Sequence, residues 1–181
     1  CGVDVAAAGG AVTAVRPAVA GLAVRVLEGD DQIELTVRGH DVVIFGYEGE
    51  PYLWLSDTGV RRNERSPATY LNQTRYGDVR RPVVAAPDRP PVWRKVADAG
   101  RPYGWHDHRI HWMSRNDPPV VVADRDSPHR IFDWAIPGTI DGKPLAIEGR
   151  LDYEPLPGRH FPSVLLVPLG GIALLIALVR T

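Results

Sequence analysis

Hydrophobic and polar residues alternate along the first half of the chain in a way that predicts β-strands. In residues 32–38 (QIELTVR), three apolar side chains alternate with polar ones. With a period of two residues, one face of the strand lies toward a core and the other toward water. A second apolar run, residues 22–27 (LAVRVL), is separated from it by the turn-forming residues 28–31 (EGDD). The two runs therefore predict a β-hairpin.

Short apolar runs bounded by Gly, Pro and Asp continue along the chain. Further strands are expected at residues 42–46, 52–56, 92–96, 104–113, 130–136 and 143–153. The pair Asp141-Gly142 suits a type I′ turn, so the last two strands are expected to form a tight hairpin. About eight or nine strands at this spacing predict an all-β fold, an antiparallel Greek-key β-sandwich of immunoglobulin or cupredoxin type.

The strand pattern places one domain at residues 12–155. Residues 1–11 are rich in Gly and Ala, and we expect them to form a flexible N-terminal arm. Residues 61–91 contain several prolines and show no sustained period, which predicts a long surface loop. Loops of this length in compact domains tend to be functional or to be docked on a partner.

The C-terminal part of the sequence predicts a membrane anchor. Residues 161–179 carry no charge over 19 residues, which as a helix would span about 28 Å and could cross a bilayer. Residues 156–160 would be the linker, and Arg180 would place the domain on the extracytoplasmic face of the cell membrane. The alternative is a buried C-terminal strand or helix of a soluble domain.

Cys1 admits two interpretations. Bacterial lipoproteins are cut immediately before the cysteine that receives the lipid, so Cys1 is a candidate lipidation site; the alternative is an arbitrary boundary of the sequence. As Cys1 is the single cysteine in the sequence, an intramolecular disulfide and a multi-cysteine zinc site are both excluded within these 181 residues.

Composition narrows the class of protein further. The chain has 21 Lys and Arg against 22 Asp and Glu, a net charge of −1, and this balance argues against a nucleic-acid partner. Its 18 Gly and 17 Pro are typical of many short strands and turns and argue against a helix bundle.

One segment carries candidate chemistry. Half of the six histidines and the single Met lie between residues 105 and 113 (WHDHRIHWM). On a strand over residues 104–113, His106 and His108 would share one face, with about 6–7 Å between their Cβ atoms, so that both rings can bind one metal ion. His111 and Met113 would lie on the other face.

A third ligand would then come from His40, from His129, or from His111 if the strand bulges. Imidazole suits copper, zinc and nickel, and the thioether of Met113 favours Cu(I). We therefore expect a copper ion held by His106, His108, His111 and Met113 for storage, delivery or sensing. The alternatives are that the histidines only form structural hydrogen bonds or that they sense pH.

Several segments carry a family resemblance: WHDHRIHWM (105–113), GYEGEPYL (46–53) and RSPATYLNQ (65–73), together with the PPVWRKV and DWAIP runs. Over most of residues 12–160 the chain resembles a family of actinobacterial membrane-anchored envelope proteins whose function is unassigned. The resemblance implies an export signal, a β-rich outer domain and a C-terminal transmembrane helix, and it implies no reaction. A weaker similarity, of architecture alone, is to periplasmic copper-binding β-sandwiches that use an N-terminal histidine, from which Cys1 departs.

Signals for catalysis are weak. Glu48 and Glu50 lie in a Gly- and Pro-containing turn, where solvent-facing carboxylates are more usual than a catalytic pair. The sequence has no P-loop, dinucleotide fingerprint or nucleophile elbow, so we expect no enzyme. The alternative function is a non-catalytic accessory module that docks on a membrane protein through residues 61–91, since Tyr70, Tyr76 and several arginines match the composition of interface cores.

Overall fold

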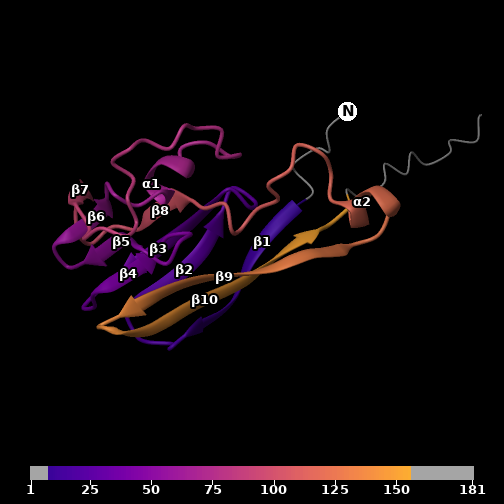
Figure 1. Cartoon of the computed structure of the whole chain (residues 1–181). Helices are drawn as coiled ribbons and strands as arrows, with labels where there is room; N and C mark the ends of the chain where they lie inside the picture. The colour runs from indigo at the N-terminus through magenta and orange to yellow at the C-terminus, as the bar shows by residue number, and fades with distance from the viewer. Residues whose placement is uncertain (1–7, 156–181) are drawn as a thin grey trace, which may run out of the picture.

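A computed structural model describes residues 8–155 (Figure 1). Within these residues, the strands form a seven-stranded antiparallel sheet, in the order β1-β10-β9-β4-β5-β6-β7, and a three-stranded antiparallel sheet, β2-β3-β8. The elements are β1 (Ala8–Arg16), β2 (Leu22–Leu27), β3 (Gln32–Val37), β4 (Val42–Phe45), β5 (Pro51–Ser56), β6 (Gly59–Asn63), α1 (Ala68–Leu71), β7 (Trp93–Ala97), β8 (Tyr103–His106), α2 (Pro119–Ala123), β9 (His129–Ile140) and β10 (Lys143–Tyr153). The predicted all-β, two-sheet class is confirmed.

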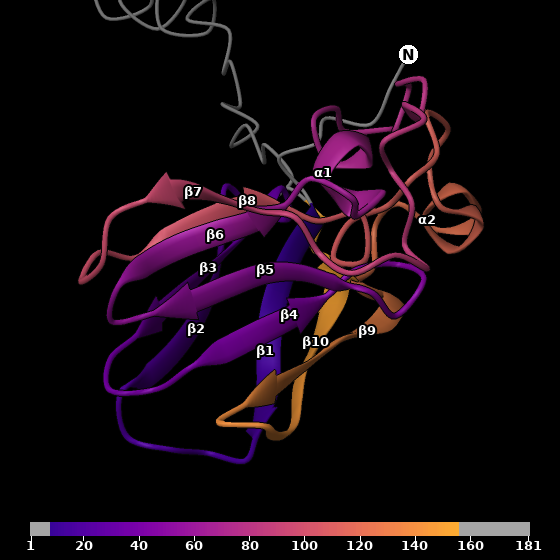
Figure 2. The same cartoon turned by 60° about the vertical axis from the view of Figure 1, so that its left-hand side comes forward.

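The two sheets share a hydrophobic core. Ile33 and Leu35 of β3 are fully buried in the same cluster as Ile44 of β4 and Ile136 of β9. Buried residues alternate with half-buried ones along β3, as its sequence predicts. Burying each such side chain contributes about 1.5–3 kcal/mol, and the larger sheet curves round the smaller one to cover it (Figure 2).

The β9–β10 hairpin is long, and β1 pairs with β10 as far as Tyr153 (Figure 1). At its turn, φ is 49° for Asp141 and 75° for Gly142, and a type I′ turn requires positive φ at both positions. The predicted tight hairpin is therefore confirmed. At the far end, Val121 of α2 and Tyr153 form a second small core with Ile131.

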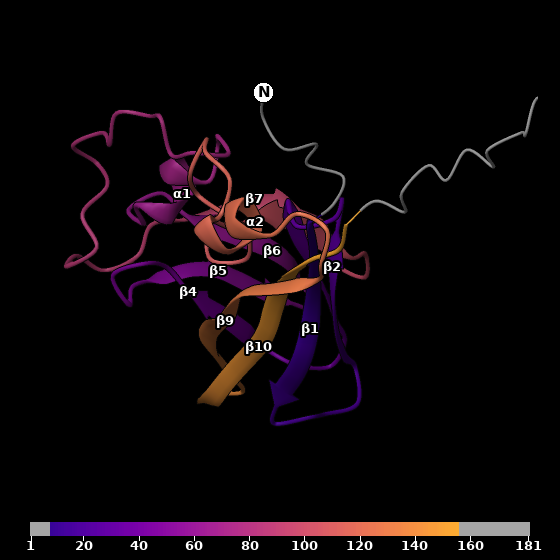
Figure 3. The same ribbon diagram turned by 90° about the vertical axis from the view of Figure 1, so that its right-hand side faces the viewer.

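Both helices and the long connection between β6 and β7 lie at the end of the sheets away from the β9–β10 turn (Figure 3). The expected 61–91 loop starts later than predicted, because β6 runs to Asn63 and pairs with β5 and β7. The helix α1 then lies inside the loop. The irregular segment is thus residues 64–92, which we call the excursion.

The N-terminal arm expected at residues 1–11 is wrong for its last four residues. The strand β1 begins at Ala8, and Gly10 pairs with Leu151 of β10. Small residues are poor strand formers in isolation, but here they allow a close approach to β2. A Cβ at Gly10 would lie 3.0 Å from Cγ1 of Val26.

The strand predicted over residues 104–113 is confirmed for residues 104–106 and wrong beyond them. The strand β8 ends at His106, and residues 108–111 form a turn and a bend. The reason is the buried side chain of Asp107, which binds the backbone and side chain of Arg109 and reverses the chain.

No helix within residues 8–155 is long and apolar enough to cross a membrane. The predicted linker 156–160 and membrane helix 161–179 lie outside the described residues, as does the candidate lipidation site Cys1.

Candidate metal centre

A buried carboxylate builds the turn that follows β8. The Asp107 side chain is fully buried. Its Oδ1 accepts hydrogen bonds from the Arg109 backbone N–H (3.1 Å) and Nε (2.8 Å), and its Oδ2 accepts from Arg109 Nη2 (2.7 Å) and Trp105 Nε1 (2.9 Å). The N–H of Ile110 donates to the Asp107 carbonyl at 3.2 Å, and the Ile110 side chain is fully buried. The hydrogen bonds of Asp107 and the burial of Ile110 therefore hold the turn in place.

The Asp107–Arg109 pair stays ionised in this environment. Burial alone would raise the pKa of Asp107, but the hydrogen bonds and charge of Arg109 hold that pKa below its usual value. Arg109 also donates to the carbonyl of Phe45 (3.0 Å) and lies over the ring of Tyr47 (5.1 Å to its centre). The pair thus attaches the turn to the end of β4.

The turn brings three histidine rings together. The ring centres of His106 and His111 are 4.7 Å apart, those of His106 and His108 are 5.2 Å apart, and those of His108 and His111 are 5.6 Å apart. One ring nitrogen from each residue lies within 4.8 Å of those from the other two. The third histidine is thus His111, and a turn rather than a bulge brings it there.

The other candidates for a third ligand bind elsewhere. His40 contacts Asp141 (2.7 Å) and the carbonyl of Ala20 (2.9 Å), and His129 donates to the carbonyl of Asp124 (2.6 Å). Neither belongs to the group of possible metal ligands.

In each ring of the cluster, one nitrogen forms a hydrogen bond with a backbone carbonyl oxygen. The bonds run from His106 Nδ1 to the Asp31 oxygen (2.7 Å), from His108 Nε2 to the Thr74 oxygen (2.8 Å) and from His111 Nδ1 to the Trp112 oxygen (3.1 Å). A carbonyl oxygen can only accept, so these nitrogens carry the hydrogens. In the neutral rings the lone pairs are then on Nε2 of His106, Nδ1 of His108 and Nε2 of His111. Histidines that bind metals are oriented in this same way.

The free nitrogens of His106 and His111 face each other. Their Nε2 atoms are 3.0 Å apart, and two lone pairs at that distance repel unless a proton or a metal ion lies between them. Burial lowers the pKa of His111 to about 4, with a further lowering from the charge of Arg75, and burial also lowers the pKa of His108. Neutral rings are the form that binds metals.

The distances are close to those of a metal site. Nitrogens at 2.0–2.1 Å from one ion are about 3.3 Å apart in a tetrahedron and at most about 4.2 Å apart across the ion. The 3.0 Å pair is near the first value. In the full cluster, within 4.8 Å, the widest pair of nitrogens must close by about 0.6 Å to lie across one ion and by about 1.5 Å to fit a tetrahedron.

A second layer of contacts supports the rings. Asp31 Oδ1 lies 3.2 Å from His106 Nδ1 and 2.7 Å from Arg75, and Arg75 also pairs with the buried Asp30 (3.0 Å). The ring of Tyr47 stacks on His108 with centres 5.8 Å apart, and its hydroxyl accepts the His108 backbone N–H (3.0 Å).

The excursion takes part in the site. The Tyr47 hydroxyl donates to Asn72, Thr74 supplies a carbonyl to His108, and Arg75 reaches Asp31. Residues 72–75 therefore hold two of the three rings in place. The docking of this segment on a partner stays a prediction.

Met113 lies at the edge of the cluster. It is 40% exposed, and it lines an open surface pocket together with His108, His111, Arg109, Trp112, Ser114 and Phe132. Of the four predicted ligands, three are thus brought together, and the fourth borders them on the side open to solvent.

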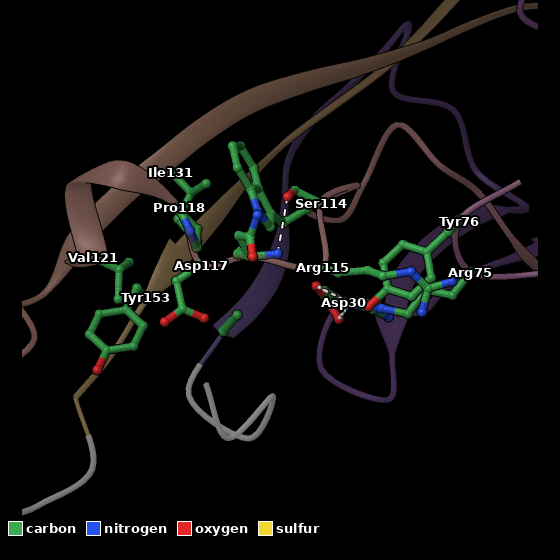
Figure 4. Close-up of a pocket in the computed structure, with 13 residues that line it drawn as sticks. Asp30, Arg75, Tyr76, Ser114, Arg115, Asp117, Pro118, Val121, Ile131 and Tyr153 are labelled. Carbon is green, nitrogen blue, oxygen red and sulfur yellow. Dashed lines mark hydrogen bonds and ion pairs between the residues drawn. The ribbon is translucent and has the colours of Figure 1, made fainter. Parts of the chain in front are cut away.

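A second pocket adjoins the cluster and has a volume of about 190 Å³. One end is apolar, with Val121, Ile131 and Tyr153, and the other end holds the Asp30–Arg75 pair (Figure 4). Trp112, whose carbonyl orients His111, lies in its wall. This pocket could not be predicted from the sequence, because its walls come from segments far apart in the chain.

The supporting residues were also missed. The sequence pattern predicts only a hairpin turn at Asp30 and Asp31 and a loop at Thr74. The local signal that was available is Asp107, since Asp commonly binds the backbone two residues ahead and starts a turn. No protein-family model, curated protein or solved structure matches this chain.

Proposed function

We propose that residues 8–155 bind one transition-metal ion through Nε2 of His106, Nδ1 of His108 and Nε2 of His111. The observation that carries the proposal is that one ring nitrogen of each histidine lies within 4.8 Å of those of the other two, with the Nε2 atoms of His106 and His111 3.0 Å apart. A structural role alone would be satisfied by the one carbonyl hydrogen bond that each ring makes and would not require the three rings to cluster.

Copper is the preferred ion in this proposal. Imidazole nitrogens suit copper, zinc and nickel, and Cu²⁺ binds a given nitrogen site more tightly than the other divalent ions of its row. The thioether of Met113 lines the adjoining pocket and favours copper further for the reduced ion alone, because thioethers bind Cu(I). Zinc is the competing outcome of a metal titration.

The proposal includes the place and use of the metal. We propose a membrane-anchored domain on the extracytoplasmic face, of immunoglobulin or cupredoxin type, in the actinobacterial envelope family that the sequence resembles. There it would store, deliver or sense copper without turning over a substrate. The charge-free run at residues 161–179 supports the anchor.

Metal content and copper titration of the purified domain test the site. A His106→Ala, His108→Ala double variant should lose stoichiometric copper, whereas a matched His40→Ala, His129→Ala double variant should keep it, because neither of those rings belongs to the cluster. Both variants should retain the β-rich circular dichroism spectrum. Equal copper binding by both variants would overturn the proposal.

A second candidate function is the docking of this domain on a membrane protein through the excursion. The observation that favours it is a pair of exposed apolar residues, Val83 (101% exposed) and Val84 (49%), which make few contacts with the domain. Deleting the whole excursion would also remove Thr74 and Arg75. The cleaner test is a photo-crosslinking residue at position 83, with position 98 as control, which should give a discrete adduct only at position 83.

A further inference from the structure

This inference rests on the proposed metal site and concerns what the ion binds besides the protein. We propose that the ion in the three-histidine cluster keeps an open coordination position that faces solvent and takes a small anion. Among the described residues, the cluster contains three histidines and no carboxylate or thiolate ligand. Sites with three protein ligands commonly leave a position for water or an exogenous ligand, whereas structural sites use four.

The protein closes the cluster on several sides. Asp31 and Arg75 lie behind His106, the excursion lies against His108 through Thr74, and the His111 side chain is only 1% exposed. Access is from the pocket that His108 and His111 line. A ligand that enters by this pocket therefore reaches the rings of His108 and His111 directly.

The charges around the cluster favour an anion in that position. Three neutral imidazoles leave the charge of a divalent ion uncompensated. Of the nearby acids, Asp107 is paired with Arg109, and Asp30 and Asp31 share Arg75, so the net charge of about −1 that these side chains leave is smaller than the charge of the ion. A small monoanion would thus gain from the charge of the ion, and the ion would lose no protein ligand.

Met113 is the alternative ligand for the open coordination position. Its thioether lines the same pocket and would close the open position if it bound the ion. At 40% exposure the side chain lies at the rim, so an anion can approach without displacing buried protein. The two outcomes differ in what a Met113→Leu variant does, because leucine keeps the apolar bulk and removes the sulfur.

The test is a titration of the Cu(II)-loaded protein with sodium azide, followed by visible absorption and electron paramagnetic resonance. Metal analysis before azide is added shows whether the site loads, so failure of the proposed function is seen separately. We expect a saturable azide-to-copper charge-transfer band with one azide per copper, and an azide affinity within about twofold for Met113→Leu. The His106→Ala, His108→Ala variant should give no such band, which excludes copper bound elsewhere.

Two results would overturn the open position. A copper-loaded wild-type protein whose spectra do not change with azide would show a closed site. A band seen with Met113→Leu and absent from the wild type would show that the thioether occupies the position.

Discussion

Nε2 of His106 and Nε2 of His111 lie 3.0 Å apart. His106 is the last residue of β8, and His111 lies beyond the turn that follows it. Both rings use Nδ1 to donate to a carbonyl, so each presents an unprotonated nitrogen to the other when neutral. The fold thus holds two lone pairs together, with a third on His108 nearby. Such an arrangement is unfavourable unless a proton or a metal ion lies between the two facing nitrogens.

The first prediction concerns the turn. Asp107→Asn removes the charge that compensates the buried Arg109, and breaking a buried ion pair from one side costs about 3–5 kcal/mol. We expect the free energy of unfolding of the metal-free protein, measured by urea denaturation, to fall by about 3 kcal/mol. Copper affinity should fall too, because the turn no longer holds His111 against His106.

Asp133→Asn is the matched control for the turn. Asp133 pairs with Arg130, and its side chain is 72% exposed, so the loss should be below about 1 kcal/mol. Equal losses for the two variants would contradict the structural role given to Asp107.

The second prediction concerns the support of His106. Asp31→Ala removes a carboxylate 3.2 Å from His106 Nδ1 and leaves the charge of Arg75 less compensated, whereas the Asp31 carbonyl that orients the ring is retained. Removing such supporting groups commonly weakens metal binding 10–100-fold. We expect about tenfold weaker copper binding by isothermal titration calorimetry. Asp88→Ala, at a site 79% exposed, should leave the affinity unchanged.

The third prediction is a pH dependence away from the metal site. A hydrogen bond to Asp141 and another to the carbonyl of Ala20 raise the pKa of His40 above its usual value. A raised pKa in the folded state means that the protonated ring stabilises the fold below its unfolded pKa of about 6.5, and that this stabilisation is lost as the pH rises through the folded pKa.

Unfolding of the wild type and of His40→Gln at a series of pH values checks this. The wild type should be the more stable at about pH 5, and the difference should shrink by about pH 9. The Asp141→Asn variant should lose most of the pH-dependent stabilisation that His40 contributes. A difference that grows with pH would contradict the assigned sign.

The fourth prediction concerns the hairpin core. Gly149 of β10 pairs with Trp134 of β9, and a Cβ at Gly149 would lie 2.0 Å from Cζ2 of that ring. Gly149→Ala must therefore displace a buried indole, and overpacking of this kind costs about 1–3 kcal/mol. Gly9→Ala, where no atom lies within 4 Å of the added Cβ, should change the thermal midpoint little. Comparable losses for both would argue against the packing described.

Elements specified by neighbouring residues could be predicted from the sequence. The β2–β3 hairpin follows from its alternation, and the β9–β10 turn follows from Asp141-Gly142. The stretch after His106 could not be predicted in the same way, because its apparent alternation is overridden by the buried Asp107–Arg109 pair and by a bond from Arg109 to the distant carbonyl of Phe45.

In the candidate site, too, local features could be predicted from the sequence and contacts with distant residues could not. The density of histidines indicated the right residues, since it depends on spacing within nine positions. Their mutual geometry depends on carbonyl groups 75 and 34 residues away, those of Asp31 and Thr74. Local spacing contains no information on such partners, so the supporting residues emerged only from the fold.

Counting the imidazole ligands of bound copper tests the metal site most directly. X-ray absorption and pulsed electron paramagnetic resonance of the Cu(II)-loaded wild-type protein should show three histidine nitrogens on one ion per chain. His111→Ala should show two and bind copper more weakly. A wild-type protein that holds no stoichiometric copper, or a ligand count that His111→Ala does not change, would contradict the three-histidine centre.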